Sequence, residues 1–262
     1  MENLFRNNLL LEMLNAFGKV ATKLEIDFFL VGALARDFRM HNNSKLASKR
    51  MTRDVDIAIL LASEDEFYKL KEALLATGDF VAHEQEAIKL FYRQVIEVDL
   101  LPFGEIENLD RETRIEKPRP FIMDVPGFKE VLPAAEQVTV EGLTIRVCPL
   151  EGIVLLKIIA NADNPSRTKD ITDIEHIIDV YFELNDNRIY EEYNDVLALY
   201  DAGDMDYLQL VSARVIGRIM GRLLTGSPTL RQRVLDILHG KSSGGYWMEM
   251  SEGIAEGIGF RR

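Results

Sequence analysis

The sequence predicts an α/β protein of the α+β kind, in which a small domain with a mixed sheet is followed by a helical domain. Two observations predict this class. Up to residue 148 short β-rich runs alternate with helical segments, whereas from Pro149 onward apolar residues recur at helical spacing. With 47% hydrophobic residues in a chain of 262, both parts have side chains for a core. We therefore predict an α/β domain over residues 1–148 and a helical domain over residues 149–262.

The chain begins with a helix, a strand, a turn and a second helix. Apolar residues at helical spacing predict an amphipathic helix over residues 3–24, and residues 28–31 are typical of a buried strand. Gly32 ends that strand, and residues 33–38 are rich in helix formers. A helix that starts directly after a strand points its free amide groups beyond the strand end, where anions bind well.

An acidic strand follows. Asp54 and Asp56 lie two residues apart in an apolar run that predicts a strand to Leu61, so both carboxylates are expected on one face. At a rise of roughly 3.3 Å per residue their Cα atoms lie about 6.6 Å apart, and two carboxylates at that spacing can hold one or two hard divalent cations. Negative charge in an apolar strand is costly unless a cation balances it. The functional interpretation of this pair is therefore a metal site. The polar face of an edge strand is the structural alternative.

The rest of the N-terminal part predicts short elements. Ser63 and Glu66 form a capping-box pattern, and the residues after them predict a helix that Gly78 ends. The other predictions are an antiparallel hairpin of residues 88–92 and 95–101, a second hairpin of residues 138–140 and 143–147, and loops over residues 41–53 and the proline-rich residues 110–133.

The C-terminal part is predicted to be helical. The periodicity predicts helices over residues 150–161, 170–183, 187–200, 205–224 and 228–239. Residues 241–245 are typical of a flexible linker, since no strand precedes them as one would precede a phosphate-binding loop.

Composition narrows the class of protein. The net charge of −12 repels polyanions at long range, although Lys45, Lys49, Arg50 and Arg53 form a basic cluster before the acidic strand. That cluster is either a solvated loop or part of a groove. Cys148 is the only cysteine, which excludes an intrachain disulfide and a cysteine-based zinc site. Without an apolar stretch of membrane-spanning length or a signal peptide, a cytoplasmic protein with no membrane anchor is expected.

Gly32, Asp54, Asp56 and a later strand acid, Asp99, occur in the order found in nucleotidyltransferases of the polymerase-β type, which residues 28–101 resemble. The resemblance implies transfer of a nucleoside monophosphate from a nucleoside triphosphate, such as ATP, to a hydroxyl acceptor, with pyrophosphate leaving. It implies two Mg²⁺ ions, with Mn²⁺ as a substitute, held by the three aspartates. Asp99 can also accept the proton of the attacking hydroxyl.

The resemblance assigns nucleotide binding to the turn after the first strand, at Gly32, Ala33 and Arg36. Ala33 departs from the family, which has Ser or Gly there, because alanine offers no hydroxyl to the triphosphate. Arg36 has a structural alternative, a local contact with Asp37 within the helix. For the third acid, Glu97 on the same strand face is the substitute for Asp99, which fits the family pattern better.

A second region narrows the resemblance. Lys157, and the Lys-Asp-x-x-Asp segment at residues 169–173, resemble the lysine helix and acidic segment of AbiEii-type nucleotidyltransferases, a group that includes toxins of bacterial toxin and antitoxin pairs. The resemblance implies that Lys157 grips phosphate and that an aspartate acts with it; the structural alternative is a lysine that extends from a buried helix. A helical projection places Asp170 beside the apolar stripe and Asp173 toward solvent, so Asp170 is the predicted inward-facing acid.

Three functions follow from the resemblance. The first is an AbiEii-like toxin that transfers nucleotides to RNA or tRNA, with an antitoxin protein as its partner. The second is transfer to a small molecule such as an aminoglycoside, which the acidic net charge favours over a nucleic acid. The third is a nucleotide-binding protein that has lost turnover, which Ala33 motivates.

Overall fold

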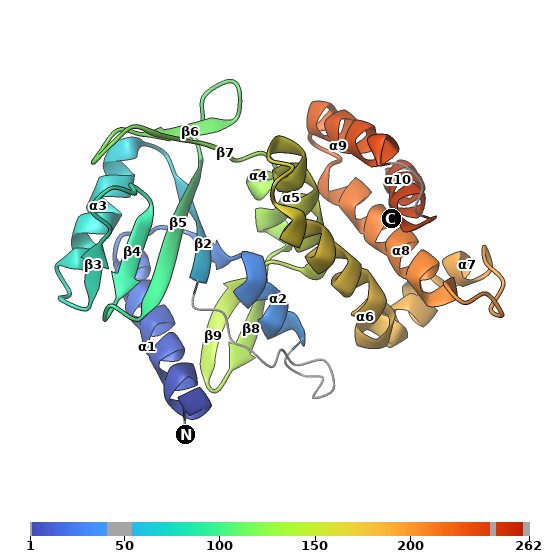
Figure 1. The fold of residues 1–262 in the computed structure, drawn as a ribbon, viewed down its shortest axis with the longest axis horizontal. Coiled ribbons are helices and arrows are strands. Elements are labelled where there is room, and N and C mark those ends of the chain that lie inside the picture. The colour runs from blue at the N-terminus through green and yellow to red at the C-terminus, as the bar shows by residue number, and fades with distance from the viewer. Residues whose placement is uncertain (1, 41–53, 242–244, 259–262) are drawn as a thin grey trace. The chain divides into compact units, whose positions relative to one another are not determined.

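The computed structural model describes residues 2–40, 54–241 and 245–258. They form two compact units, and the chain passes from the first to the second between Cys148 and Pro149 (Figure 1). Unit 1 combines helices with a mixed sheet and unit 2 is helical, which confirms the predicted fold class. The basic cluster predicted within residues 41–53 lies outside the described residues. None of the described helices combines the length and the apolar character that a bilayer crossing needs.

Unit 1 contains four α-helices and nine strands among its described residues. The helices are α1 (Glu2–Lys23), α2 (Gly32–Met40), α3 (Glu64–Leu75) and α4 (Phe128–Val131), and a 3-10 turn (Leu132–Ala134) follows α4. The strands are β1 (Phe28–Leu30), β2 (Asp54–Leu61), β3 (Phe80–Ala82), β4 (Lys89–Tyr92), β5 (Ile96–Gly104), β6 (Glu112–Ile115), β7 (Phe121–Asp124), β8 (Glu136–Val140) and β9 (Leu143–Val147).

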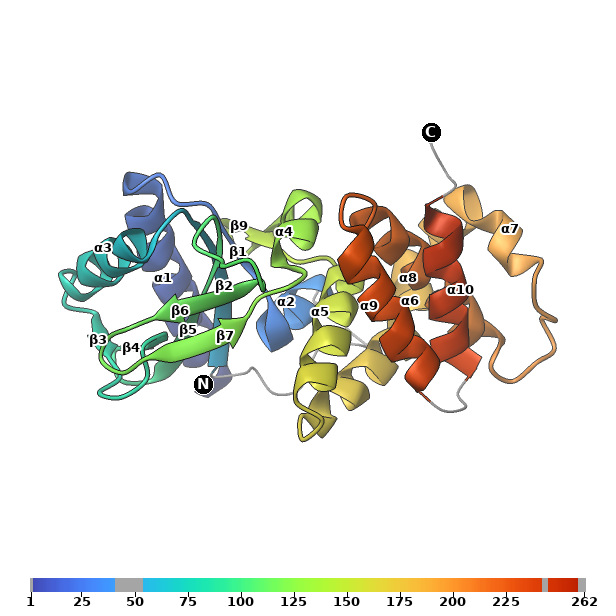
Figure 2. The ribbon, with the colours of Figure 1, turned by 90° about the horizontal axis from the view of Figure 1, so that it is seen from above.

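The main sheet has the strand order β3-β4-β5-β2-β1-β9-β8. β2 is parallel to β5 and antiparallel to β1. The end of β1 and the starts of β2 and β5 therefore lie at the same edge of the sheet, the edge that the strand ends form. Helices α1 and α3 lie side by side on one face of the sheet (Figure 2). Phe17 of α1 and Phe67 of α3 are completely buried there, while alternation along β2 buries Val55 and Ile57. The acids at this edge therefore stand on a firmly packed strand.

The predicted capping box begins α3. The amide of Glu66 donates to Ser63 Oγ at 3.4 Å, and the Glu66 carboxylate accepts from the amide of Ala62 at 2.7 Å. Both predicted hairpins are also present, as β4–β5 and β8–β9. Strand β3, which pairs with β4 at the edge of the sheet, was not predicted.

The prediction of a loop over residues 110–133 is wrong. This segment forms the hairpin β6–β7 and the short helix α4. Its prolines do not interrupt the ladder, because Pro118 and Pro120 lie in the turn and Pro126 follows β7. The hydroxyl of Thr113, which is buried, donates to the carbonyl of Pro102 at 2.9 Å and fixes the hairpin to the end of β5.

Unit 2 consists of α5 (Leu150–Asp163), α6 (Thr168–Glu192), α7 (Asn194–Leu197), α8 (Tyr207–Leu223), α9 (Pro228–Gly240) and α10 (Gly245–Gly257). The predicted helices over residues 170–183 and 187–200 are wrong in their boundaries, since α6 continues to Glu192 through a kink at Asn185. The Asn185 side chain donates to the carbonyl of Tyr181 at 3.0 Å at this kink. Helix α10 was not predicted.

Candidate active site

Four carboxylates share one face of the sheet at the edge where β2 and β5 begin. In the parallel register of these strands Asp54 lies opposite Glu97, and Asp56 lies opposite Asp99. Residues at alternate positions of paired strands point to the same face. The structure therefore brings together Asp54, Asp56 and Asp99, the three acids predicted as metal ligands, and adds Glu97 to them.

The turn after β1 lies directly against Asp56. The amide of Val31 donates to the carbonyl of Asp56 at 3.1 Å, and Gly32 has a φ of +66°. A Cβ atom at Gly32 would lie only 2.1 Å from Asp56 Oδ2, so a larger residue would displace this carboxylate from its position. Helix α2 starts at this glycine, and its first amide groups therefore lie at the same edge as the acids.

Gly32→Ala is expected to destabilise unit 1 by about 2–4 kcal/mol, because the methyl group adds a clash with Asp56 to the cost of a left-handed alanine. Urea unfolding measures this. Gly78→Ala is the matched control, since Gly78 has a φ of +79° but no heavy atom within 4 Å of a built Cβ. An equal loss of stability in the two variants would contradict a special contact between Gly32 and Asp56.

Asp99 is the acid whose environment is most unusual. Its Oδ1 atom is buried and, within the described part of the chain, accepts no hydrogen bond. Burial raises the pKa of Asp99 above its ordinary value, while the positive charge of Lys89 offsets part of that shift. A buried carboxylate oxygen without a donor is costly in a folded protein, so this atom is suited to a bound cation or to a proton.

Lys89 of β4 is a residue of this face that the sequence analysis missed. It forms an ion pair with Glu97, and its Nζ atom lies 3.6 Å from Asp99 Oδ1 and 3.7 Å from Glu86 Oε2. Because Lys89 lies opposite Asp99 in the antiparallel register of β4 and β5, its side chain extends over the acids. Only the pairing of the strands reveals this position.

The donor set fits a hard divalent cation. Mg²⁺ prefers oxygen ligands and is usually bound by one or two carboxylates together with substrate phosphates. Among the described residues, no three carboxylate, imidazole or thiol side chains are gathered closely enough to hold a metal by themselves. For Asp54, Asp56 and Asp99 to hold a cation, further oxygen ligands, such as those of a bound phosphate group, would be needed.

Helix α2 carries the predicted nucleotide-binding residues. Ala33 lies in its first turn, next to Gly32. The Arg36 guanidinium donates to Asp37 Oδ1 at 3.0 Å, which is the local contact considered as its structural alternative. Arg39 donates to the carbonyls of Val147 and Cys148 at 2.6 and 3.1 Å, and so fastens the end of α2 to the end of β9.

The predicted lysine and aspartate of unit 2 are in direct contact. Lys157 Nζ lies 2.8 Å from Asp170 Oδ1, and Arg167 donates to Asp170 Oδ2 at 2.6 Å. Asp170 is 3% exposed, in agreement with the inward orientation predicted for it. Asp173 was predicted to face solvent, but its carboxylate also pairs with the lysine: Asp173 Oδ2 lies 2.7 Å from Lys157 Nζ. The lysine side chain is long enough to contact both aspartates, which lie about one helical turn apart on α6.

Two cations hold Asp170 in its charged form. Burial alone would raise the pKa of Asp170, but the hydrogen bonds from Arg167 and Lys157 outweigh it and lower the pKa below its ordinary value. A carboxylate with a lowered pKa stabilises the folded state above its unfolded pKa of about 3.9, and this contribution is lost as the pH falls through the folded pKa.

Asp170→Asn is expected to lower the free energy of unfolding by about 1–3 kcal/mol at pH 7. The difference from the unchanged chain should shrink as the pH falls below about 4, since this carboxylate binds a proton in the unfolded chain first and in the folded chain at a lower pH. Urea unfolding between pH 3 and pH 7 measures it. Asp236→Asn, at an exposed position of α9, is the control for the charge change. A difference that grows toward low pH would contradict the ion pairing.

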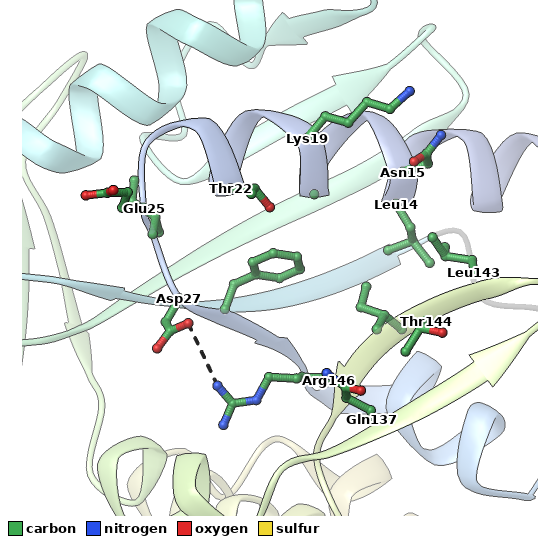
Figure 3. Close-up of a pocket in the computed structure, with 14 residues that line it drawn as sticks. Leu14, Asn15, Lys19, Thr22, Glu25, Asp27, Gln137, Leu143, Thr144 and Arg146 are labelled. Carbon is green, nitrogen blue, oxygen red and sulfur yellow. Dashed lines mark ion pairs between the residues drawn. The ribbon is translucent and has the colours of Figure 1, made fainter.

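A cavity of 680 Å³ in unit 1 lies apart from the acidic face, between α1, the start of β1 and the hairpin β8–β9 (Figure 3). Lys19 and Thr22 of α1 line it, together with Asp27 and Arg146, whose charged atoms are 3.9 Å apart. None of the predicted site residues lines this cavity. The acids lie at the opposite end of β1.

The sequence of this chain matches a known protein family. A sequence model of the family described as "Nucleotidyl transferase AbiEii toxin, Type IV TA system" matches residues 18–237. The search of curated proteins finds no match.

Several solved structures are similar, among them the following two. The solution structure of the antibiotic-resistance factor ANT(2'')-Ia is 16% identical, with a TM-score of 0.45, over 74% of this chain and 95% of that one. An antigenic nucleotidyltransferase-like protein from Paracoccidioides brasiliensis is 17% identical, with a TM-score of 0.42, over 87% of this chain and 92% of that one. The family match covers both units and most of the chain. This chain therefore belongs to the AbiEii family of nucleotidyltransferases.

Proposed function

We propose that this nucleotidyltransferase is metal-dependent and moves a nucleoside monophosphate from a nucleoside triphosphate to a hydroxyl group of an RNA, with tRNA as the first candidate. The reaction would take place in the cytoplasm. The observation that carries the proposed metal and triphosphate binding is the row formed by Gly32, Asp56 and Asp99: a glycine turn against one carboxylate, and a second, partly buried carboxylate opposite it. A glycine turn suits close approach of phosphate, and paired acids suit a cation beside it.

The chain's own groups account for the chemical steps. The acceptor oxygen attacks the α-phosphorus, the new P–O bond forms, and the bond to the bridging oxygen of the β-phosphate breaks, so that pyrophosphate leaves with that electron pair. Asp99 accepts the hydroxyl proton, since its carboxylate lies opposite Asp56 on the face where the acceptor would meet the triphosphate. The amide groups at Gly32 and Ala33 bind triphosphate oxygens.

Divalent cations are part of the proposal. Asp54, Asp56 and Asp99 would hold Mg²⁺, or Mn²⁺ in its place, and two ions are expected once the triphosphate and the acceptor are bound. When bound, the metal would neutralise charge on the triphosphate and on the departing pyrophosphate. The three side chains are oxygen donors, which both ions accept.

Lys157 and Asp170 are proposed to act in the same reaction. An ammonium group suits phosphate binding, and Arg36 of α2 is proposed as a further contact to the nucleotide. Asp170 would hold Lys157 in place, since the distance between Lys157 Nζ and Asp170 Oδ1 is 2.8 Å and Asp170 is buried. Lys157 would release one carboxylate, Asp170 or Asp173, when it binds phosphate.

A small-molecule hydroxyl, such as that of an aminoglycoside, is the second candidate acceptor. The net charge of −12 favours it, because an acidic protein attracts cationic aminoglycosides and repels RNA. An antitoxin protein is the proposed partner if the chain acts as a toxin, in keeping with the description of its family.

The acceptor experiment separates these alternatives. The purified chain is incubated with Mg²⁺ and each of the four nucleoside triphosphates, labelled at the α-phosphate, with total tRNA, with tRNA whose 3′ end has been oxidised, or with an aminoglycoside mixture. Label on intact tRNA alone would support the RNA acceptor. Label on aminoglycosides alone would support the small-molecule acceptor. Nucleotide binding without transfer to any acceptor would favour a protein that has lost turnover.

A further inference from the structure

A lysine belongs to the row of acids on the sheet of unit 1. The register places Asp56 of β2, Asp99 of β5 and Lys89 of β4 side by side on three neighbouring strands. Adjacent strands are separated by about 4.8 Å, so the three side chains leave the same face within reach of one another. Lys89 thus occupies the end of the row next to the third acid.

The contacts of Lys89 are all with carboxylates. It pairs with Glu97, and its Nζ atom lies 3.6 Å from Asp99 Oδ1 and 3.7 Å from Glu86 Oε2. Its side chain is only 15% exposed, so the ammonium group is held close to the sheet rather than extended into solvent. One positive charge therefore offsets three negative charges at this end of the face.

We propose that Lys89 is a resident cation of the acidic face, which limits the nucleotide-free chain to one divalent cation, held by Asp54 and Asp56. An ammonium group so close to Asp99 repels a second divalent cation from the position between Asp56 and Asp99. The inference rests on the proposed metal dependence and goes beyond it, because it names the residue that sets the number of ions. It makes Lys89 a positioning residue that acts through Asp99 and Glu97.

A purely structural ion pair predicts a different outcome. If Lys89 only stabilised the hairpin β4–β5, its removal would lower the stability of the chain and leave metal binding unchanged. The number and affinity of bound ions therefore distinguish the two roles. Neither quantity requires an acceptor or turnover.

The test counts Mn²⁺ ions bound to the full-length chain without nucleotide, by electron paramagnetic resonance of free Mn²⁺ during titration. The unchanged chain should bind one ion. Lys89→Met should bind two ions, the second at least about tenfold more tightly than any second ion on the unchanged chain. Lys89→Arg keeps the positive charge and should bind one. Lys69→Met, at an exposed position of α3, makes the same charge change and should also bind one.

A second variant protects the test against misfolding. Lys89→Met combined with Glu97→Gln removes one charge of each sign, so the net charge of the face is unchanged, and it should also bind two ions. Binding of one ion, or of none, by both Lys89→Met variants would overturn the inference, as would two ions on the unchanged chain.

Failure of the proposed metal site has a separate signature. Asp54→Ala should lose the first ion, whatever Lys89 does. If Asp54→Ala still bound the first ion as the unchanged chain does, the proposed metal site itself would be wrong. If Asp54→Ala lost it and Lys89→Met gained none, only the role of Lys89 would be wrong.

Discussion

Replacement of Asp54 by alanine is expected to reduce nucleotidyl transfer by about 10²–10³-fold or more, because the cation that balances charge on the triphosphate would lose a ligand. Asp54 is exposed at the start of β2, so its side chain contributes little to the core. Removal of one carboxylate from a face with four also relieves repulsion between like charges. The free energy of unfolding should therefore stay within about 0.5 kcal/mol of that of the unchanged chain.

The measurement is the initial rate of label transfer at saturating triphosphate, with thermal unfolding recorded on the same sample. Asp65→Ala removes the same charge from an exposed position of α3 and should transfer at the unchanged rate. Undiminished transfer by Asp54→Ala, or transfer by the unchanged chain that persists after removal of divalent cations, would contradict the assigned role of Asp54.

Gly253→Ala is expected to lower the free energy of unfolding of unit 2 by about 3 kcal/mol. Helices α8 and α10 approach closely through glycines, and a Cβ atom at Gly253 would lie 2.3 Å from the carbonyl oxygen of Arg214 and 2.9 Å from the amide nitrogen of Arg218. Both neighbours are backbone atoms, so no side chain can rotate away. The helices would have to separate.

The separation would also disturb a network of charges. Arg214 donates to Glu256 and Glu249, and Arg218 donates to Glu256, so two arginines of α8 are held by acids of α10. Arg218 is 5% exposed, and a buried charge that loses its partners is costly. The clash and the weakened pairs act in the same direction.

The control variant is expected to leave the free energy of unfolding unchanged or to raise it. Gly240, at the end of α9, has no heavy atom within 4 Å of a built Cβ. Gly240→Ala should be neutral or stabilise by up to about 1 kcal/mol, because alanine is the better helix former. Chemical denaturation followed by circular dichroism compares the two variants. If Gly253→Ala were as stable as Gly240→Ala, the close packing of α8 on α10 would be wrong.

The acidic strand could be predicted from the sequence because its signal is local. Alternation of Asp54, Val55, Asp56 and Ile57 fixes which side chains share a face, whatever the strand pairs with. The capping box of α3 is local in the same way. Asp170 followed from helical periodicity, since one apolar stripe defines the inner side of α6.

Other features depended on contacts that are distant in sequence. Helix α10 has three glycines, which sequence propensity counts against a helix, yet Gly253 and Gly257 are required where α8 approaches. The hairpin β6–β7 has strands of four residues and prolines in its turn, and its position depends on contacts with β5 and α3. Lys89 could be assigned to the acidic face only from the register of β4 and β5.

The position of the label in the product tests the central claim most directly. The unchanged chain is incubated with Mg²⁺, the acceptor and one triphosphate, labelled at the α-phosphate in one reaction and at the γ-phosphate in the other. Nucleotidyl transfer predicts that the α-label joins the acceptor while the γ-label leaves as pyrophosphate. Transfer of the γ-label to the acceptor would show phosphoryl transfer instead, and would contradict the chemistry assigned to Asp54, Asp56 and Asp99.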